Sequence, residues 1–434
     1  MAIRKAVVVG ANGTMGAGTA ALLGAAGVPT VMLARTREKA EAGRARADHL
    51  AKGKLAGAPI TCGSYDDDLA AALADADLVL EAVAEDPAAK RDVFARLDDA
   101  RTDGTIVATV SSGLSIAALC AERSADFRAC FLGVHLFNPP TAIVGCELIA
   151  HAGTDPAVVG AVRDFLAGAL RREVVETNDT PAFAGNRLGF RLLNEVAQLA
   201  EEHGVAFMEQ LVGSHTGRVL PPLATIDLVG WDVHKAIVDN LHARTRDAAH
   251  DQFRLPGVIA RGIERGHLGR KTRDKGGFFR LEGKGADARQ LVLDPATFDY
   301  RPLAEAAPPM PAFIGLMRER AGARDLPAAM AVLCADTTHA GALLRRIIAG
   351  YVSYGLGLVG EVVARPRDID RIMAFGFGWA PPSAIVDAIG AAGAIELIEG
   401  AGLPVPAAIA DAATTNRALF DEPALDCHRF FAAA

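Results

Sequence analysis

The stretch KAVVVGANGTMGAGTAALLGAAGVPTVMLA, residues 5–34, decides the fold of the first part of the chain. Residues 5–9 form a β-rich run, residues 15–26 have helical composition, and residues 30–33 resume an apolar strand. This order predicts a βαβ unit. Its glycine-rich turn lets backbone amides approach a pyrophosphate at a helix N-terminus, although such a turn can also pack a helix without a ligand. We expect a dinucleotide to contact Gly10, Gly13, Thr14, Met15 and Gly16.

The run from residue 6 to residue 34 carries no charge, which is also a property of signal peptides and membrane spans. Gly10, Gly13 and Gly16 interrupt this run early and Pro29 interrupts it late, so one continuous apolar helix is unfavourable. We therefore interpret the run as the βαβ unit and expect no membrane span.

The end of the second strand, VMLARTREKA at 31–40, departs from the usual dinucleotide pattern. A carboxylate normally bonds the adenosine ribose at this position, but Ala34 and Arg35 stand here. Arg35 and Arg37 are suited to a 2′-phosphate, which makes NADP(H) an alternative cofactor. A solvated helix start explains the two arginines equally well.

Composition excludes several classes of protein. The chain has 434 residues, 51% of them hydrophobic, which indicates large buried cores. Its net charge of −7 argues against a nucleic-acid partner. The six cysteines form no CxxC pair, so we expect neither a metal site nor a disulfide framework. A reducing cytoplasm is the expected location.

The predicted secondary structure changes near residue 180, from alternating strands and helices to long helices. Apolar strand candidates at 78–81, 105–110 and 131–135 alternate with helical segments, which predicts a mostly parallel α/β sheet. Long helical segments follow. Segments 194–230 and 360–390 resemble each other, each with a Pro-Pro turn and an Asp-x-x-Gly ending, and their alignment pairs Glu195 with Glu361 and Asp227 with Asp387. We predict a Rossmann-type domain at 1–178, a helical domain at 179–283, a linker at 284–310 and a second helical domain at 311–434.

The segment GVHLFNPPTAIVGCELI, residues 133–149, carries a candidate acid/base pair. A histidine accepts protons near neutral pH, and a nearby carboxylate stabilises the imidazolium form. His135 follows an apolar strand, and Glu147 lies a short distance further along the chain. This pattern indicates a catalytic dyad, with a purely structural histidine as the alternative.

Motifs along nearly the whole chain resemble the 3-hydroxyacyl-CoA dehydrogenase family. They are, in order, ADLVLEAVAEDPAAKRDVF (76–94), SSGLSI (111–116), VHLFNPP (134–140), TPAFAGNRL (180–188) and LGRKTRDKGGFFR (268–280). The resemblance is closest to the long bacterial β-oxidation form, without its fused enoyl-CoA hydratase. It implies an α/β Rossmann-type domain followed by all-α domains, a duplicated 6-phosphogluconate-dehydrogenase-like helical domain. The implied activity is that of an L-3-hydroxyacyl-CoA dehydrogenase with NAD(H), acting on an acyl-CoA, with a separate enoyl-CoA hydratase as an implied partner.

The resemblance also implies roles for individual residues. His135 would be the general base, Glu147 would orient it, and Ser112 and Asn186 would bind the substrate oxygen. Positions that line the cofactor in this family correspond to Glu85, Lys90, Asn138 and Lys271. The duplicated helical region would pack within one chain in the way that single-copy helical domains pair between subunits.

Some features depart from the family or leave alternatives open. The glycine loop has an additional residue near Asn12, and Val110 stands where an asparagine is common. Ser111 could replace Ser112 as the operative serine if the motif shifts by one residue. A dehydrogenase of the 3-hydroxyisobutyrate or 6-phosphogluconate type is the alternative enzyme, and a cofactor-binding relative without catalysis is the alternative outside enzymes.

Overall fold

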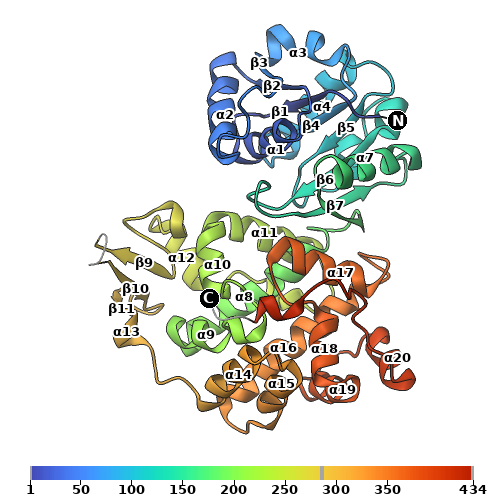
Figure 1. Ribbon diagram of the computed structural model, residues 1–434. Helices are drawn as coiled ribbons and strands as arrows, with labels where there is room; N and C mark the ends of the chain where they lie inside the picture. Colours follow the sequence, from blue (N-terminus) through green and yellow to red (C-terminus); the bar gives the residue numbers. More distant parts are fainter. Residues whose placement is uncertain (1, 284–287, 432–434) are drawn as a thin grey trace. The chain divides into compact units, whose positions relative to one another are not determined.

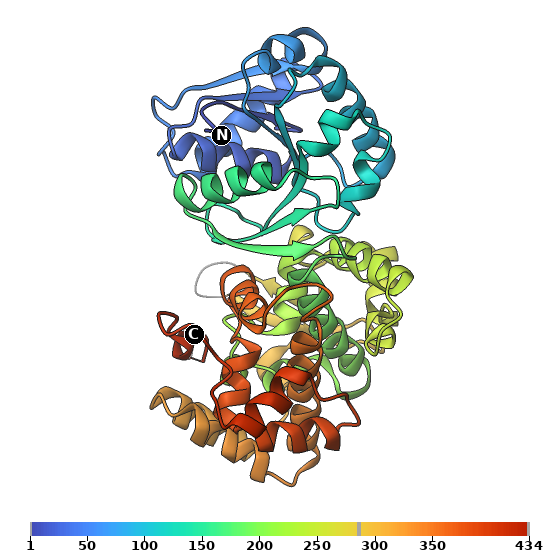
Figure 2. The same cartoon turned by 90° about the vertical axis from the view of Figure 1, so that its right-hand side faces the viewer.

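The chain forms two compact units, which are described here from a computed structural model covering residues 2–283 and 288–431 (Figures 1 and 2). The units are Met1–Phe183 and Ala184–Ala434. The predicted boundary between residues 178 and 179 lies earlier than this division, at the end of the last strand of the sheet. The two helical regions that we expected as separate domains belong to a single unit.

The first unit contains one eight-stranded sheet with the order β3-β2-β1-β4-β5-β6-β7-β8. Its strands are β1 (Ala6–Val9), β2 (Thr30–Ala34), β3 (Ile60–Ser64), β4 (Leu78–Glu81), β5 (Ile106–Thr109), β6 (Phe131–Leu136), β7 (Gly145–Ala150) and β8 (Glu173–Asn178). Its helices are α1 (Thr14–Ala25), α2 (Arg37–Leu50), α3 (Tyr65–Leu73), α4 (Pro87–Ala100), α5 (Ile116–Cys120), α6 (Ala125–Ala129) and α7 (Pro156–Gly168). The predicted βαβ unit is β1-α1-β2.

Helices cover both faces of this sheet. In β1, Ala6 and Val8 pack into the core under α1, α2 and α7, while Val7 and Val9 pack into the core under α3 to α6. Side chains alternate between faces along a strand, so a strand buried on both sides must be continuously apolar. That is why short Val-rich and Leu-rich runs marked these strands in the sequence.

Strands β1 to β6 are parallel, as predicted, and β7 is antiparallel to β6. The connection from β6 to β7 runs only from Phe137 to Val144, which is too short for the crossover that a parallel neighbour needs. The parallel arrangement returns with β8, because α7 supplies a crossover after β7. The exception to the predicted parallel sheet therefore comes from one short loop.

The second unit is mostly helical. Its α-helices are α8 (Gly185–His203), α9 (Val205–Leu211), α10 (Pro222–Val229), α11 (Trp231–Arg244), α12 (Gly257–Glu264), α13 (Leu303–Ala306), α14 (Ala312–Gly322), α15 (Leu326–Ala335), α16 (His339–Gly357), α17 (Pro366–Ile372), α18 (Pro382–Ile389), α19 (Ala391–Gly400) and α20 (Ala407–Thr415). Short turns are η1 (Ser214–Thr216), η2 (His250–Phe253), η3 (Gly269–Lys271), the π-helical η5 (Met373–Phe377) and η6 (Cys427–Phe430).

The duplication seen in the sequence recurs in this unit. Helices α9, α10 and α11 correspond to α17, α18 and α19, and Gly217 and Gly378 take the same left-handed conformation before the second helix of each set. Asp227 accepts hydrogen bonds from the amides of residues 278 and 279, and Asp387 does the same for residues 419 and 420. The proposed pairing of Glu195 with Glu361 does not fit, because Glu195 lies inside α8 whereas Glu361 follows α16.

The two copies contact each other within the chain. The amide of Ala380 donates to the carbonyl of Gly217 at 2.7 Å, and Arg218 and Trp379 form an antiparallel β-bridge. Arg187 of α8 donates to Tyr354 at 2.9 Å and Glu361 at 2.7 Å from the second copy. Equivalent segments of the two copies therefore pair with each other, as they would across a twofold axis.

The segment predicted as a linker is structured where the structure describes it; residues 284–287 lie outside the described residues. Strands β9 (Phe279–Glu282), β10 (Arg289–Leu293) and β11 (Tyr300–Pro302) form an antiparallel sheet, followed by α13. Leu291, Val292 and Leu293 are buried. The Pro-rich and Ala-rich composition concealed this short apolar strand.

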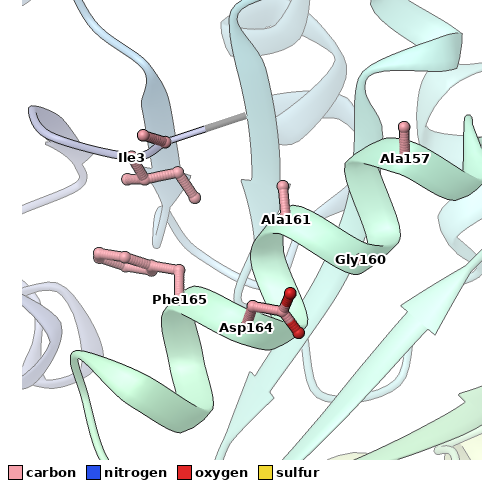
Figure 3. A pocket seen from close by; sticks show the side chains of 7 residues that line it. Ile3, Ala157, Gly160, Ala161, Asp164 and Phe165 are labelled. Atoms are coloured by element: carbon pink, nitrogen blue, oxygen red, sulfur yellow. The ribbon is translucent and has the colours of Figure 1, made fainter.

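Two further features concern the surface. No helix in residues 2–283 and 288–431 is long and apolar enough to cross a membrane. A shallow pocket of about 430 Å³ lies beside α7, lined by Ile3, Ala157, Ala161 and Phe165 among others (Figure 3). Ile3 precedes β1, whereas the glycine loop follows it. This pocket therefore lies at the opposite ends of the strands from the predicted site.

Candidate active site

The glycine loop joins β1 to α1 and packs closely against the protein's own backbone. Gly10 has φ +82°, and a Cβ on it would lie 2.6 Å from the backbone of Ala82. A Cβ on Gly16 would lie 2.3 Å from the carbonyl oxygen of Gly10. Helix α1 begins at Thr14 with no side-chain cap and no acid in its first turn. Its first amides, including those of Thr14, Met15 and Gly16, therefore remain available to an anion.

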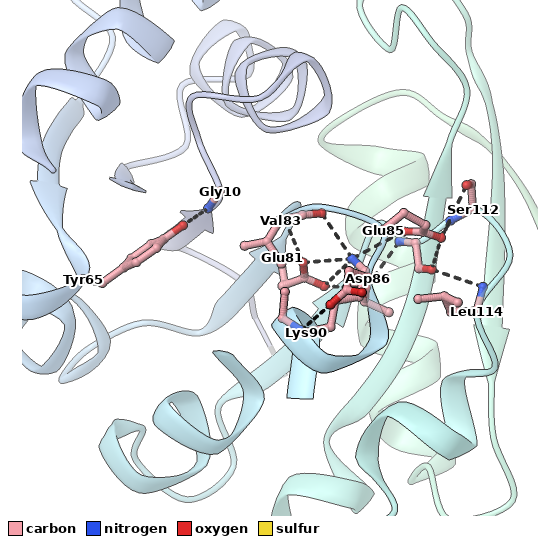
Figure 4. A network of polar contacts seen from close by, with 12 residues as sticks. Gly10, Tyr65, Glu81, Val83, Glu85, Asp86, Lys90, Ser112 and Leu114 are labelled. Atoms are coloured by element: carbon pink, nitrogen blue, oxygen red, sulfur yellow. Dashed lines mark hydrogen bonds and ion pairs between the residues drawn. The ribbon is translucent and has the colours of Figure 1, made fainter. Parts of the chain in front are cut away.

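These observations fit the pyrophosphate of a dinucleotide. Gly13 precedes the helix, and its amide donates to the carbonyl of Gly10 at 3.1 Å, which closes the turn. The amide of Gly10 donates to the Tyr65 hydroxyl at 2.9 Å, a contact that the sequence did not suggest (Figure 4). The loop is thus held by its own backbone and by the start of α3.

Arg35 follows β2 directly after buried Ala34. Its side chain is exposed, and it has no acidic partner within the described residues. Arg37 differs, because it donates to both carboxylate oxygens of Asp68, at 3.0 and 2.9 Å. Of the two arginines, Arg35 alone keeps its charge available beside the edge of the sheet where the glycine loop lies.

His135 and Glu147 form a buried pair on neighbouring strands. They are direct partners in the antiparallel register of β6 and β7, and His135 Nδ1 lies 2.6 Å from Glu147 Oε2. Their exposed fractions are 5% and 0%. A histidine that donates its Nδ1 proton to a carboxylate keeps a lone pair on Nε2. The pair can therefore accept a proton at Nε2 and stabilise the resulting charge.

Two phenylalanines enclose the His135 ring. The centroid of Phe137 lies 4.8 Å from it and that of Phe183 lies 5.8 Å from it. Phe183 and its neighbour Ala182 both have positive φ, 55° and 59°, a conformation that is unfavourable for residues with a side chain. Such strain persists where the surrounding packing fixes it, often at functional sites.

Lys90 and Glu81 form a second buried pair, after β4. Lys90 Nζ donates to both oxygens of Glu81, at 2.9 and 3.0 Å, and the two side chains are 1% and 0% exposed. The Thr109 hydroxyl donates to Glu81 at 2.6 Å. Lys90 was predicted to line the cofactor; its ammonium group is enclosed by the protein, where it neutralises Glu81.

Glu85 joins this pair to the serine loop after β5 (Figure 4). One carboxylate oxygen of Glu85 accepts from the Ser111 hydroxyl at 2.5 Å and from the Ser112 amide at 2.9 Å. The other lies 3.5 Å from Lys90 Nζ. Ser111 is fully buried and Ser112 is half-buried. Of the two serines, Ser112 is the one that is partly exposed to solvent.

The remaining predicted residues lie in different parts of the chain. Asn138 is exposed after β6, next to Pro140, which lies against Gly18 of α1. Asn186 is 6% exposed in the first turn of α8, in the second unit. Lys271, also in the second unit, forms an ion pair with Asp232 at 2.7 Å. The structure does not relate the two units, so it brings neither Asn186 nor Lys271 to the His135 pair.

Sequence reasoning missed Glu81, Tyr65 and Phe183. Glu81 could have been found, because a charged residue within the apolar run LVLE requires a buried partner. Phe183 lies within the motif TPAFAGNRL (180–188), but that motif does not indicate its contact with His135. No comparable sequence signal marks Tyr65.

Four neighbouring strands carry the site. The glycine loop, Glu85, Ser112 and His135 lie at the carboxyl ends of β1, β4, β5 and β6, which are consecutive in the sheet. Ligands of open parallel sheets bind at this edge. A glycine loop suited to a dinucleotide lies at the same edge as a histidine that is hydrogen-bonded to a carboxylate. This combination is typical of nicotinamide-dependent oxidoreductases that use an acid/base pair.

Comparison with known proteins identifies the family. Residues 5–180 match the family model described as 3-hydroxyacyl-CoA dehydrogenase, NAD binding domain, and residues 183–278 match the C-terminal domain of the same family. The chain belongs to the 3-hydroxyacyl-CoA dehydrogenase family, as its motifs predicted. It is 32% identical over 435 residues to a probable 3-hydroxyacyl-CoA dehydrogenase of Bacillus subtilis. That alignment covers 93% of this chain, which spans about half (53%) of the relative's length.

Two solved structures are also similar. A (S)-3-hydroxybutyryl-CoA dehydrogenase from Ralstonia eutropha is 28% identical with a TM-score of 0.55, covering 63% of this chain and 97% of that chain. A 3-hydroxybutyryl-CoA dehydrogenase from Escherichia coli K12 covers 96% of this chain and 99% of its own, with a TM-score of 0.69 and 20% identity. The second likeness concerns the fold alone, and it includes the duplicated helical region. These matches favour the predicted family over the 3-hydroxyisobutyrate or 6-phosphogluconate type.

Proposed function

We propose that this chain is an L-3-hydroxyacyl-CoA dehydrogenase that moves a hydride between C3 of an acyl-CoA and a nicotinamide cofactor. The main support for this proposal is the His135–Glu147 pair. Its Nδ1 and Oε2 atoms lie 2.6 Å apart, and the pair is buried at the sheet edge where the glycine loop lies. The family membership supports the same reaction. The nicotinamide, when bound, supplies the hydride acceptor or donor.

The chain's own residues handle the proton and orient the substrate. His135 Nε2 takes the proton of the 3-hydroxyl, and Glu147 stabilises the imidazolium through Nδ1. Ser112 donates a hydrogen bond to the substrate oxygen, and we propose the same role for Asn186 on the family match alone. Asn138, Glu85, Lys90 and Lys271 are proposed to serve the cofactor, with Lys90 acting through the charge of its neighbours.

The test compares variants of the acid/base pair. Oxidation of 3-hydroxybutyryl-CoA is followed by cofactor absorbance for the wild type, His135→Ala, Glu147→Gln and Glu176→Gln. Glu176 is an exposed glutamate of β8 paired with Arg163, so Glu176→Gln serves as the matched control. We expect His135→Ala and Glu147→Gln to lower kcat/KM by at least ~100-fold, in line with general-base catalysis. Wild-type turnover that His135→Ala leaves intact would refute the proposal, and absence of turnover would favour a cofactor-binding protein without catalysis.

We further propose that Arg35 contacts the 2′ position of the adenosine ribose and allows the enzyme to use NADP(H) as well as NAD(H). The support is an exposed guanidinium in place of the usual acid, while Arg37 is bound to Asp68. Arg35→Ala should raise the KM for NADPH about tenfold and leave the KM for NADH within twofold, because a charged contact to phosphate contributes ~1.5 to 3 kcal/mol. Arg37→Ala is the control. An unchanged NADPH/NADH ratio in Arg35→Ala would remove this role.

The family's longer relatives also inform the partner proposal. Two relatives are named putative fatty acid oxidation complex trifunctional enzymes. We propose that a separate enoyl-CoA hydratase supplies the 3-hydroxyacyl-CoA to this chain, because hydration of an enoyl-CoA forms that hydroxyl group.

A further inference from the structure

The loops after β4 and β5 are joined by one carboxylate. Oε1 of Glu85 accepts hydrogen bonds from the Ser111 hydroxyl at 2.5 Å and from the Ser112 amide at 2.9 Å, and the Ser112 hydroxyl lies 3.4 Å from the same atom (Figure 4). The Ser111 hydroxyl also accepts from the Leu114 amide at 3.3 Å. A single oxygen therefore fixes the backbone at the serine proposed to bind the substrate.

Glu85 is held from its other side as well. Its Oε2 lies 3.5 Å from Lys90 Nζ, whose charge is already balanced by buried Glu81. The Glu85 side chain is 41% exposed, so without partners it would sample several rotamers. The fully buried Ser111 hydroxyl, with its short charge-assisted hydrogen bond, selects one of them.

We propose that Ser111 is a positioning residue that fixes the Glu85 carboxylate, which in turn holds the Ser112 amide and so fixes the backbone of the serine proposed to bind the substrate oxygen. This inference rests on the proposed function. It assigns different tasks to the two adjacent serines: Ser112 touches the substrate, and Ser111 acts only through Glu85. The proposed role requires a side-chain hydroxyl at position 111, and threonine can supply it as well as serine.

The first readout is amide hydrogen exchange in the unliganded protein. Ser111→Ala should speed exchange in a peptide covering 112–114 about tenfold, because the Ser112 and Leu114 amides lose their supports. Ser115→Ala is the matched control: Ser115 lies on the same loop but binds Asp179 and the Ala118 amide, so its loss should affect residues 116–118 instead. Unchanged exchange at 112–114 in Ser111→Ala would show that no such clamp exists.

The second readout separates positioning from simple structural support. Ser111→Ala should lower kcat about tenfold, and Ser111→Thr should restore kcat to within threefold of the wild type. In a Glu85→Ala background, adding Ser111→Ala should cost less than twofold, because a residue that acts through Glu85 has nothing left to position.

Equal losses in both backgrounds, or a loss that Ser111→Thr does not rescue in a folded protein, would overturn the proposal. Exchange measurements require no turnover. A wild type without acyl-CoA activity would therefore refute the proposed function, while the exchange result would still decide whether Ser111 and Glu85 form the clamp.

Discussion

The pair of positive-φ residues beside His135 has a measurable energetic consequence. Ala182 has φ 59°, a region that costs residues with a Cβ about 1 kcal/mol, and it lies next to Phe183, which packs on His135. Ala182→Gly should therefore raise the free energy of unfolding by ~0.5 to 1 kcal/mol. Chemical denaturation measures this change.

The control for this substitution has the opposite expected sign. Ala45 is exposed in the middle of α2, where glycine costs helix stability of about 1 kcal/mol. Ala45→Gly should therefore destabilise the protein. A loss of stability in both variants would show that the backbone at Ala182 is not strained.

Asp370 predicts how stability varies with pH. Burial raises the pKa of Asp370 to about 7, and its carboxyl group accepts from the Ser383 amide at the start of α18. The folded state therefore holds this proton over a pH range in which the unfolded state has lost it. The contribution to stability is complete below about pH 4 and is lost as the pH rises through about 7.

The isosteric variant Asp370→Asn removes this titration. Between pH 4 and pH 8 the wild type should lose ~2 to 4 kcal/mol relative to the variant, from the size of the displacement of the pKa. Urea denaturation at both pH values measures the difference. A difference between wild type and variant that does not change with pH would contradict the assignment.

At the scale of secondary structure, the sequence predicted some elements better than others. Strands β1, β2, β4, β5 and β6 were evident because they are buried on both faces and hence mostly apolar, with Glu81 and His135 near the carboxyl ends of β4 and β6. Strand β7 was not predicted, because Glu147 interrupts its apolar run. That buried glutamate faces His135 as its cross-strand partner, a contact that the residues of β7 alone do not reveal.

The site residues also differ in how far the sequence alone could identify them. Motifs singled out the glycine loop, His135 and Glu147 in the sequence, because each is tied to a short local pattern. The choice between Ser111 and Ser112 required the structure, since the two adjacent serines differ only in burial and in what their hydroxyls contact. The enclosed state of Lys90 likewise depends on Glu81.

Packing between the helical copies predicts the effect of one glycine. A Cβ on Gly189 of α8 would lie 2.3 Å from the ring of Phe377 in η5 of the second copy. Gly189→Ala should therefore lower the unfolding free energy by ~1 to 3 kcal/mol through overpacking. Gly357 of α16, with nothing within 4 Å of its Cβ position, is the control. Equal stability of both variants in thermal denaturation would argue against this close contact.

At the scale of the whole molecule, the duplication predicts the oligomeric state. Helix α8 is covered within the chain by α16 and η5, so we expect that it does not join two copies of the protein. Gel filtration with light scattering should give the same mass for the wild type and for variants with substitutions on the exposed part of α8. A stable dimer that substitutions on α8 dissociate would contradict this expectation.

If a hydride moves between the cofactor and C3 of an acyl-CoA while His135 takes or returns the proton, a label on the nicotinamide must appear at C3 of the product. The most direct measurement uses acetoacetyl-CoA with NADH or NADPH deuterated at C4 of the nicotinamide, followed by mass spectrometry of the product. We predict 3-hydroxybutyryl-CoA with deuterium on C3, formed by the wild type and at least ~100-fold more slowly by His135→Ala. Absence of deuterium at C3 with both cofactors, or equal transfer by His135→Ala, would contradict the account.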